Sequence, residues 1–230
     1  MDRQAVENLR LAFSRKYLNA ASVLKLATDA HDFSESMALY NDLFSEKRRC
    51  SMIRYQPPFA LFADEKMALQ LVRPGSALQS LPALLEQLQM WSAQAPDLYF
   101  CEEGLLQFVR TGKMFDIPPD LCDTLDIPTR RELLLRLRRA AESDRRTLRI
   151  VYSARLALTP SMCVNVFQGR GVVFCQAIQE PDEQYCREYL MQDPILTEAL
   201  LTYLDDGHAS DWLRSQKYTL DFIDYCLRLL

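Results

Sequence analysis

Apolar residues recur at every third or fourth position near the start of the chain, which is the spacing of one face of an α-helix. This stripe covers residues 6–27. Asp32 and Glu35 then form a capping-box pattern, which predicts a second helix with an apolar face that reaches Phe44. The pattern therefore predicts a helical hairpin for residues 1–48.

The hydrophobic period shortens in the next segment. CSMIRY, FALF and MALQLV are short apolar runs, and Pro57-Pro58 and a charged tetrapeptide separate them. Such runs between turn residues are typical of consecutive antiparallel strands.

Helical and extended patterns alternate from residue 81 to residue 143. Residues 81–91 have helical spacing, LYFC predicts a buried strand, and residues 103–109 predict a short helix that ends at Gly112. Prolines then interrupt the pattern, and an arginine-rich helix is predicted for residues 129–143.

The strongest β signal lies between residues 147 and 178. TLRIVYSARL alternates, and CVNVF and VVFCQAI flank Gly169-Arg170-Gly171, where glycine supplies the positive φ of a tight turn. These patterns predict a three-stranded antiparallel meander that contains a hairpin over residues 163–178. Helices are predicted for the remainder, at about 182–191, 194–204 and 219–229.

Together these elements predict an α+β fold, in which a helical N-terminal hairpin precedes antiparallel strands and a meander packed with helices. We predict two domains, the hairpin at residues 1–48 and an α+β sensing or interaction domain at 49–230. The prolines near residues 118–128 mark a further sub-boundary.

Composition agrees with a packed protein of the cytoplasm. Of the 230 residues, 49% are hydrophobic and 25% are charged, which supports a core. Seven cysteines are at least eleven positions apart with no CxxC pair, so we predict that all are reduced. The start of the chain lacks an apolar signal segment and no long uncharged apolar run occurs, so no membrane association is predicted.

Residue types for catalysis and metal binding are scarce. The chain contains two histidines, and its six glycines form no phosphate-binding loop, so no cofactor is predicted. One loop gathers oxygen and nitrogen ligands at Asp205, Asp206, His208 and Asp211. It lacks the glycine and closing glutamate of a calcium loop, and we interpret it as a helix stop, with no metal site.

One alternative is an enzyme that uses Cys101 or the carboxylates of Glu102 and Glu103, which follow a predicted strand. A cysteine nucleophile needs a base nearby, and no family signature surrounds any of the seven cysteines. The favoured interpretation of Cys101 is a small buried residue before a helix whose first turn is acidic.

The arginine-rich helix supplies the runner-up hypothesis, which ranks ahead of the enzyme. Eight arginines lie between residues 130 and 149 against three acids, whereas the chain after residue 180 is acidic. A short helix, a turn and the arginine-rich helix at residues 120–139 have the outline of a helix-turn-helix, so direct DNA binding is an open hypothesis. Its candidate residues are Arg130, Arg131, Arg138 and Arg139. The competing interpretation is a solvated surface with ion pairs four residues apart.

From residue 80 to residue 204 the order is a helix, a strand, a Pro-Pro loop, an arginine-led helix, a meander, and then QEPDEQYCREYLMQDPILTEALLTYL. This layout resembles the sensing or dimerising half of bacterial one-component transcription regulators. The resemblance covers about half of the chain and carries no individual site residue. The first 48 residues do not match a standard helix-turn-helix.

We therefore expect a noncatalytic regulatory module that senses a small-molecule ligand or holds a protein partner. Apolar helical stripes near both ends of the chain, together with the opposite charges of residues 130–149 and of the segment after residue 180, favour a homodimer.

Overall fold

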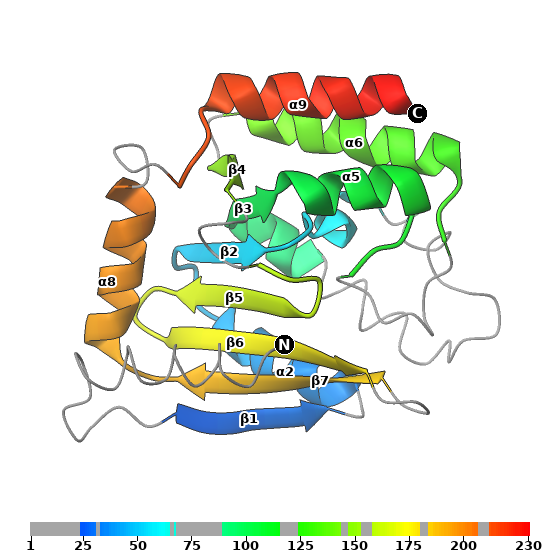
Figure 1. Ribbon diagram of the computed structural model, residues 1–230. Helices are drawn as coiled ribbons and strands as arrows, with labels where there is room; N and C mark the ends of the chain where they lie inside the picture. The colour runs from blue at the N-terminus through cyan, green and yellow to red at the C-terminus, as the bar shows by residue number, and fades with distance from the viewer. Residues whose placement is uncertain are drawn as a thin grey trace.

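The computed structural model describes residues 24–30, 33–64, 67, 89–115, 124–143, 147–152, 158–179, 184–206 and 212–230. These residues form a mixed seven-stranded sheet with helices on both faces (Figure 1). The fold is α+β, as the sequence predicts. Among the described residues, no helix is both long enough and apolar enough to cross a bilayer.

The sheet joins an antiparallel part to a parallel part. In spatial order its strands are β1 (Leu24–Ala30), β7 (Gln184–Met191), β6 (Gly171–Gln179), β5 (Met162–Phe167), β2 (Cys50–Arg54), β3 (Asp97–Cys101) and β4 (Leu148–Val151). Every pair from β1 to β2 is antiparallel, whereas β2, β3 and β4 run parallel. Strand β2 therefore has an antiparallel neighbour on one side and a parallel neighbour on the other.

The named helices are α2 (Phe33–Leu43), the 3-10 helix η1 (Phe59–Phe62), α5 (Glu102–Thr111), α6 (Ile127–Glu142), α8 (Pro194–Asp205) and α9 (Gln216–Leu229). Side-chain caps begin three of them, at Asp126, Asp193 and Ser215. Helix α5 ends at Gly112, whose φ of 68° is left-handed. Local sequence signals therefore determine where these helices begin and end.

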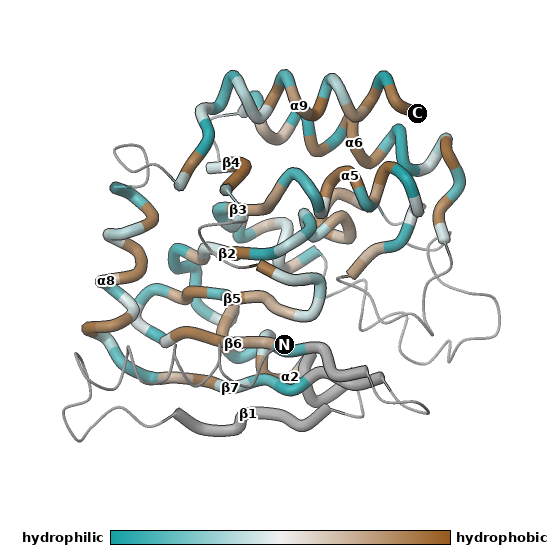
Figure 2. Tube along the Cα trace, viewed as in Figure 1, coloured by the Kyte–Doolittle hydropathy of each residue, from teal (hydrophilic) through white to brown (hydrophobic). Residues whose placement is uncertain are grey.

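One face of the sheet is covered by α2, α5, α6 and α9. Met52, Phe100 and Ile150 from three neighbouring strands point into this layer, where they form a core with Phe108 and Leu133. Figure 2 shows the hydrophilic residues of α9 on its outer side and hydrophobic ones toward α6. Helix α8 packs on β5 and β6 from the opposite face of the sheet.

Helix α5 lies against the end of β2. A Cβ atom added at Gly104 would lie 1.9 Å from the carbonyl oxygen of Tyr55, so only glycine fits at this crossing. Gln56 is buried there and donates to the carbonyl oxygens of Gly104 and Lys113. This packing fixes α5 relative to the carboxyl ends of β2 and β3.

The predicted N-terminal helix is wrong at its C-terminal end, because Leu24–Ala30 form strand β1. This segment pairs antiparallel with β7, and that long-range pairing overrides its helical spacing. The predicted second helix is confirmed as α2. The first 23 residues, and with them most of the predicted first helix, lie outside the described residues.

Two other β predictions are corrected. FALF is the buried 3-10 helix η1 and not a strand. Strand β2 pairs in parallel with β3, and its antiparallel partner is the distant strand β5. The segment before the hairpin forms β4, which pairs parallel with β3 and takes no part in the meander. The third strand of the meander is β7, which replaces the helix predicted at residues 182–191.

The remaining local predictions agree with the structure. The hairpin is confirmed, with Gly169 at φ 70° in its turn and Gly171 at φ 136° where β6 begins. Strand β3 and helices α5, α6, α8 and α9 all form where expected, and residues 89–94 are helical. MALQLV beyond Met67, residues 81–88 and most of the predicted sub-boundary at 118–128 lie outside the described residues.

Candidate functional site

Arg138 connects α6 to α9. Its Nε atom lies 2.6 Å from Oδ1 of Asp224, and its Nη2 atom lies 3.3 Å from Oδ2 of the same carboxylate. Its Nη1 atom also donates to Glu142 at 2.6 Å. The guanidinium thus acts as a bidentate clamp between two helices.

Two other candidate DNA-binding residues also bond to the fold. Arg130 donates to the carbonyl oxygen of Val109 at 2.5 Å, and Arg131 donates to that of Leu227 at 3.3 Å. Arg139 is exposed on α6. The described residues that precede α6, 124–126, are not helical, and residues 120–123 of the proposed first helix lie outside the described part.

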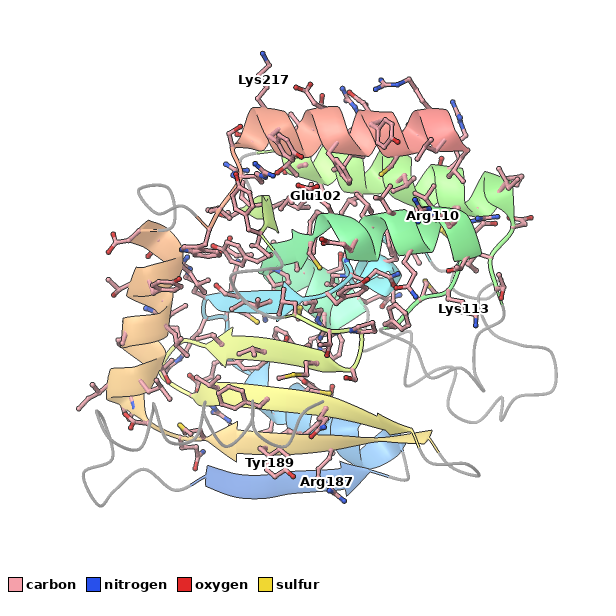
Figure 3. The ribbon with its side chains drawn as sticks, in the orientation of Figure 1. Glu102, Arg110, Lys113, Arg187, Tyr189 and Lys217 are labelled. Carbon is pink, nitrogen blue, oxygen red and sulfur yellow. The ribbon has the colours of Figure 1, made fainter. Side chains whose placement is uncertain are left out.

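The contacts of Cys101 and Glu102 are those of structural residues. The Cys101 thiol donates to the carbonyl oxygen of Tyr55 at 3.0 Å, and burial raises its pKa to about 12. Glu102, labelled in Figure 3, lies at the start of α5. It accepts from the hydroxyl of Tyr218 at 2.9 Å and lies 3.4 Å from Nε of Arg214. Glu103 lies beside Glu102 in the first turn of α5. A thiol with a raised pKa is a poor nucleophile at neutral pH.

Of the loop considered for a metal, Asp205 and Asp206 are described, at the end of α8. Asp205 makes a bidentate pair with Arg49, at 2.6 and 2.8 Å, and Arg49 also bonds to Asp97. His31, His208 and Asp211 lie outside the described residues. Within the described ranges, no group of three or more His, Cys, Asp or Glu side chains is arranged for a metal ion.

A row of polar residues crosses the sheet on the face that α2 covers. Arg54 of β2 is paired with Cys163 of β5, Cys163 with Cys175 of β6, and Cys175 with Glu188 of β7. Directly paired residues on neighbouring strands project from the same face of a sheet. We call these four residues the polar row.

Tyr40 of α2 lies over the polar row. Asn165, two residues beyond Cys163, donates to the Tyr40 hydroxyl at 2.7 Å. The same amide nitrogen lies 3.9 Å from Sγ of Cys163, and Arg54 donates to the Asn165 amide oxygen at 3.4 Å. Asn165 and Glu188 are 0% and 2% exposed, so hydrogen-bonding and charged groups gather inside an otherwise apolar layer.

The environment shifts the pKa values of two residues in opposite directions. Burial, followed by the charge of Glu188, raises the pKa of Tyr40 well above its ordinary value. A side-chain hydrogen bond with Cys175, helped by the charge of Arg54, lowers the pKa of Cys163 to about 7, although burial opposes this shift. By contrast, burial raises the pKa of Cys50, which lies on β2, the strand next to β5. Cys163 is therefore the more acidic of these two buried thiols.

The sequence interpretation did not select the polar row, although part of the signal was present. The predicted hairpin places Cys163 and Cys175 on its two arms, on either side of the turn at Gly169–Gly171. The structure adds the register, which pairs the two cysteines directly. Glu188 was missed because its segment was predicted to be helical, whereas it forms β7.

The polar row, Asn165 and Tyr40 define the candidate site. Groups with opposite charge, hydrogen-bonding capacity and shifted pKa values, gathered in one buried place, are typical of functional sites. No family model, curated protein or solved structure matches the chain.

We predict energetic coupling between Tyr40 and Asn165. Tyr40→Phe and Asn165→Leu each leave a buried polar group without its partner, which costs about 1–3 kcal/mol of unfolding free energy. The double variant removes both groups, so its loss is smaller than the sum by about 1 kcal/mol. Urea denaturation of the four proteins measures this coupling.

Thr219→Val in α9 supplies the control, because Thr219 lies over β4, three strands from β5. Combined with Tyr40→Phe it should give additive losses. If the losses of unfolding free energy in Tyr40→Phe and Asn165→Leu were also additive, this would contradict the hydrogen bond between the two residues.

Proposed function

We propose that this chain is a noncatalytic regulatory module that senses a small ligand or a protein partner, as part of a bacterial transcription regulator. The observation that carries the proposal is the polar row beneath Tyr40. A carboxylate and a guanidinium lie on the same buried sheet face, at Glu188 and Arg54, with the amide of Asn165 between their strands. Such groups give a ligand both charge and hydrogen-bond complementarity.

The placement of α2 supports a regulatory role. Tyr40 contacts the polar row through Asn165 and also packs on Trp91 and Phe167, with ring centroids 5.1 and 6.1 Å apart. A change in the polar contacts therefore acts on the same residue that anchors α2 to the core. Ligands act on a conformational equilibrium through differential contacts of this kind.

The proposal includes a cytoplasmic location and no catalytic residues. Cys50, Cys101, Cys163, Cys175 and Cys226 are free thiols. The enzyme alternative based on Cys101 is weakened by its raised pKa and by its hydrogen bond to Tyr55.

We expect a small polar molecule to stabilise the protein through the polar row. The probes are the twenty L-amino acids and the common nucleobases, tested by thermal unfolding of the full chain. A ligand at 100 times its Kd stabilises by about 2.7 kcal/mol, which raises the Tm of a chain of this size by about 5–10 °C. Glu188→Gln and Asn165→Leu should abolish the increase.

Lys217→Ala is the matched control, because this exposed residue of α9 lies far from β7 (Figure 3). It should keep the full increase in Tm. An increase in Tm that persists in both Glu188→Gln and Asn165→Leu places the ligand elsewhere. No increase with any probe rejects these ligand classes.

Direct DNA binding through α6 is the second candidate, favoured by the exposure of Arg131 and Arg139. Four phosphate contacts by the candidate arginines imply a slope of log K against log salt of about −3.6, or roughly 150-fold weaker binding between 50 and 200 mM salt. We expect that fluorescence anisotropy with random duplex DNA shows no binding whose affinity falls with salt in this way. A steep slope that falls in Arg131→Ala and Arg139→Ala favours the DNA-binding alternative.

We also propose that the chain forms a homodimer. The apolar face of α9 is used within the chain, since Ile223, Cys226 and Leu227 are buried, and Tyr225 and Leu229 remain exposed. Sedimentation equilibrium at micromolar concentration should give twice the chain mass of 26.6 kDa. If α9 forms the interface, the double variant Tyr225→Ser, Leu229→Ser should weaken the dimer. A single-chain mass at every concentration contradicts the homodimer.

A further inference from the structure

Cys163 and Cys175 are direct cross-strand partners in the β5–β6 hairpin. Their thiols project from the same face of the sheet, inside the polar row. Cys163 is 9% exposed, and Cys175 is partly exposed. The hairpin therefore holds two thiols together, one of them buried and the other partly exposed.

We propose that Cys163 and Cys175 are a redox-responsive pair that hydroperoxides convert to a cross-strand disulfide. The structure around them supports this in two ways. Arg54 and Asn165 supply a positive charge and an N–H donor next to Cys163, and the rigid hairpin keeps Cys175 in place as the second thiol. This inference concerns a modification and stands independently of the sensing function.

The chemical step is a two-electron oxidation. The Cys163 thiolate attacks one oxygen of hydrogen peroxide, the O–O bond breaks, and a sulfenic acid and hydroxide form. The Cys175 thiol then attacks the sulfenic sulfur, a disulfide forms, and water leaves. The hydroxide takes up the proton that Cys163 released, so two thiols and one peroxide give one disulfide and two waters.

The cross-strand geometry makes such a disulfide reversible. Directly opposed Cβ atoms in an antiparallel pair are about 4.5–5.5 Å apart, whereas a disulfide requires about 3.5–4.5 Å. From the longer of these separations, closing the bond draws β5 and β6 together and stores strain. Strained disulfides have more oxidising potentials and are the ones that cellular thiols reduce readily.

The electrostatic environment favours Cys163 as the attacking thiol. Hydrogen bonding with Cys175 and the charge of Arg54 lower its pKa to about 7, against burial and the charge of Glu188. Tyr40 also faces the pair from α2 and stays protonated because burial raises its pKa. A thiol with a pKa near neutral pH combines a large thiolate fraction with good nucleophilicity.

Peptide mapping of the full chain tests the proposal. The folded protein is treated with hydrogen peroxide, blocked with N-ethylmaleimide and digested with trypsin and a glutamate-specific protease. Cleavage after Arg170 separates the two cysteines, and cleavage after Glu183 separates Cys175 from Cys186. We expect a linked Cys163–Cys175 peptide pair, two fewer titratable thiols, and full reversal by dithiothreitol.

Single variants identify the role of each thiol. In Cys175→Ser the sulfenic acid on Cys163 persists and is trapped by dimedone, whereas Cys163→Ser gives no link. Cys50→Ser is the matched control, because Cys50 is also a buried strand cysteine but has a raised pKa, and it should leave the link unchanged. Circular dichroism checks the folding of each variant, and Cys→Ala replaces any Ser variant that unfolds.

Three outcomes would overturn the inference. The first is a link from Cys175 to Cys186, whose backbone lies on neighbouring strand β7. The second is oxidation of other cysteines while Cys163 and Cys175 stay reduced. The third is an equal rate of link formation in urea-unfolded protein, which would show that the hairpin does not preorganise the pair.

Discussion

The hydrogen bonds on the two edges of β2 connect all other parts of this fold. Residues 50–54 pair in parallel with β3 on one side and antiparallel with β5 on the other. The side chain of Met52, at 1% exposure, is buried under the helical layer. At the end of the same strand, Arg54 carries its charge into the polar row. A five-residue strand thus determines both the order of the sheet and one end of the candidate site.

A buried polar group in this layer requires a partner, and that requirement links α2 to the sheet. An amide or carboxylate moved from water into an apolar layer costs several kcal/mol when its hydrogen bonds are not replaced. Asn165 meets this requirement through Tyr40, which belongs to the helix above. Apolar contacts alone permit many arrangements of a helix on a sheet. The bond between Asn165 and Tyr40 selects one of them.

Predictions based on local chemistry were reliable, whereas those based on long-range pairing were not. Asp126, Gly112 and Gly169 mark helix ends and a turn through their own backbone preferences, so the sequence identifies them directly. Strand β1 could not be predicted in this way, because its partner β7 lies more than 150 residues further along the chain. The site was missed for the same reason, since Arg54 and Glu188 share a face only after four strands have assembled.

The mixed topology also separates the sheet into parts that form at different speeds. Strands β5, β6 and β7 follow one another along the chain and join through short connections, so the entropic cost of bringing them together is low. Strand β3 begins more than 40 residues after β2, and about 46 residues separate it from β4. Contacts that close long loops form late in folding. The meander, with its two cysteines already opposed, is therefore the natural nucleus onto which the parallel strands are added.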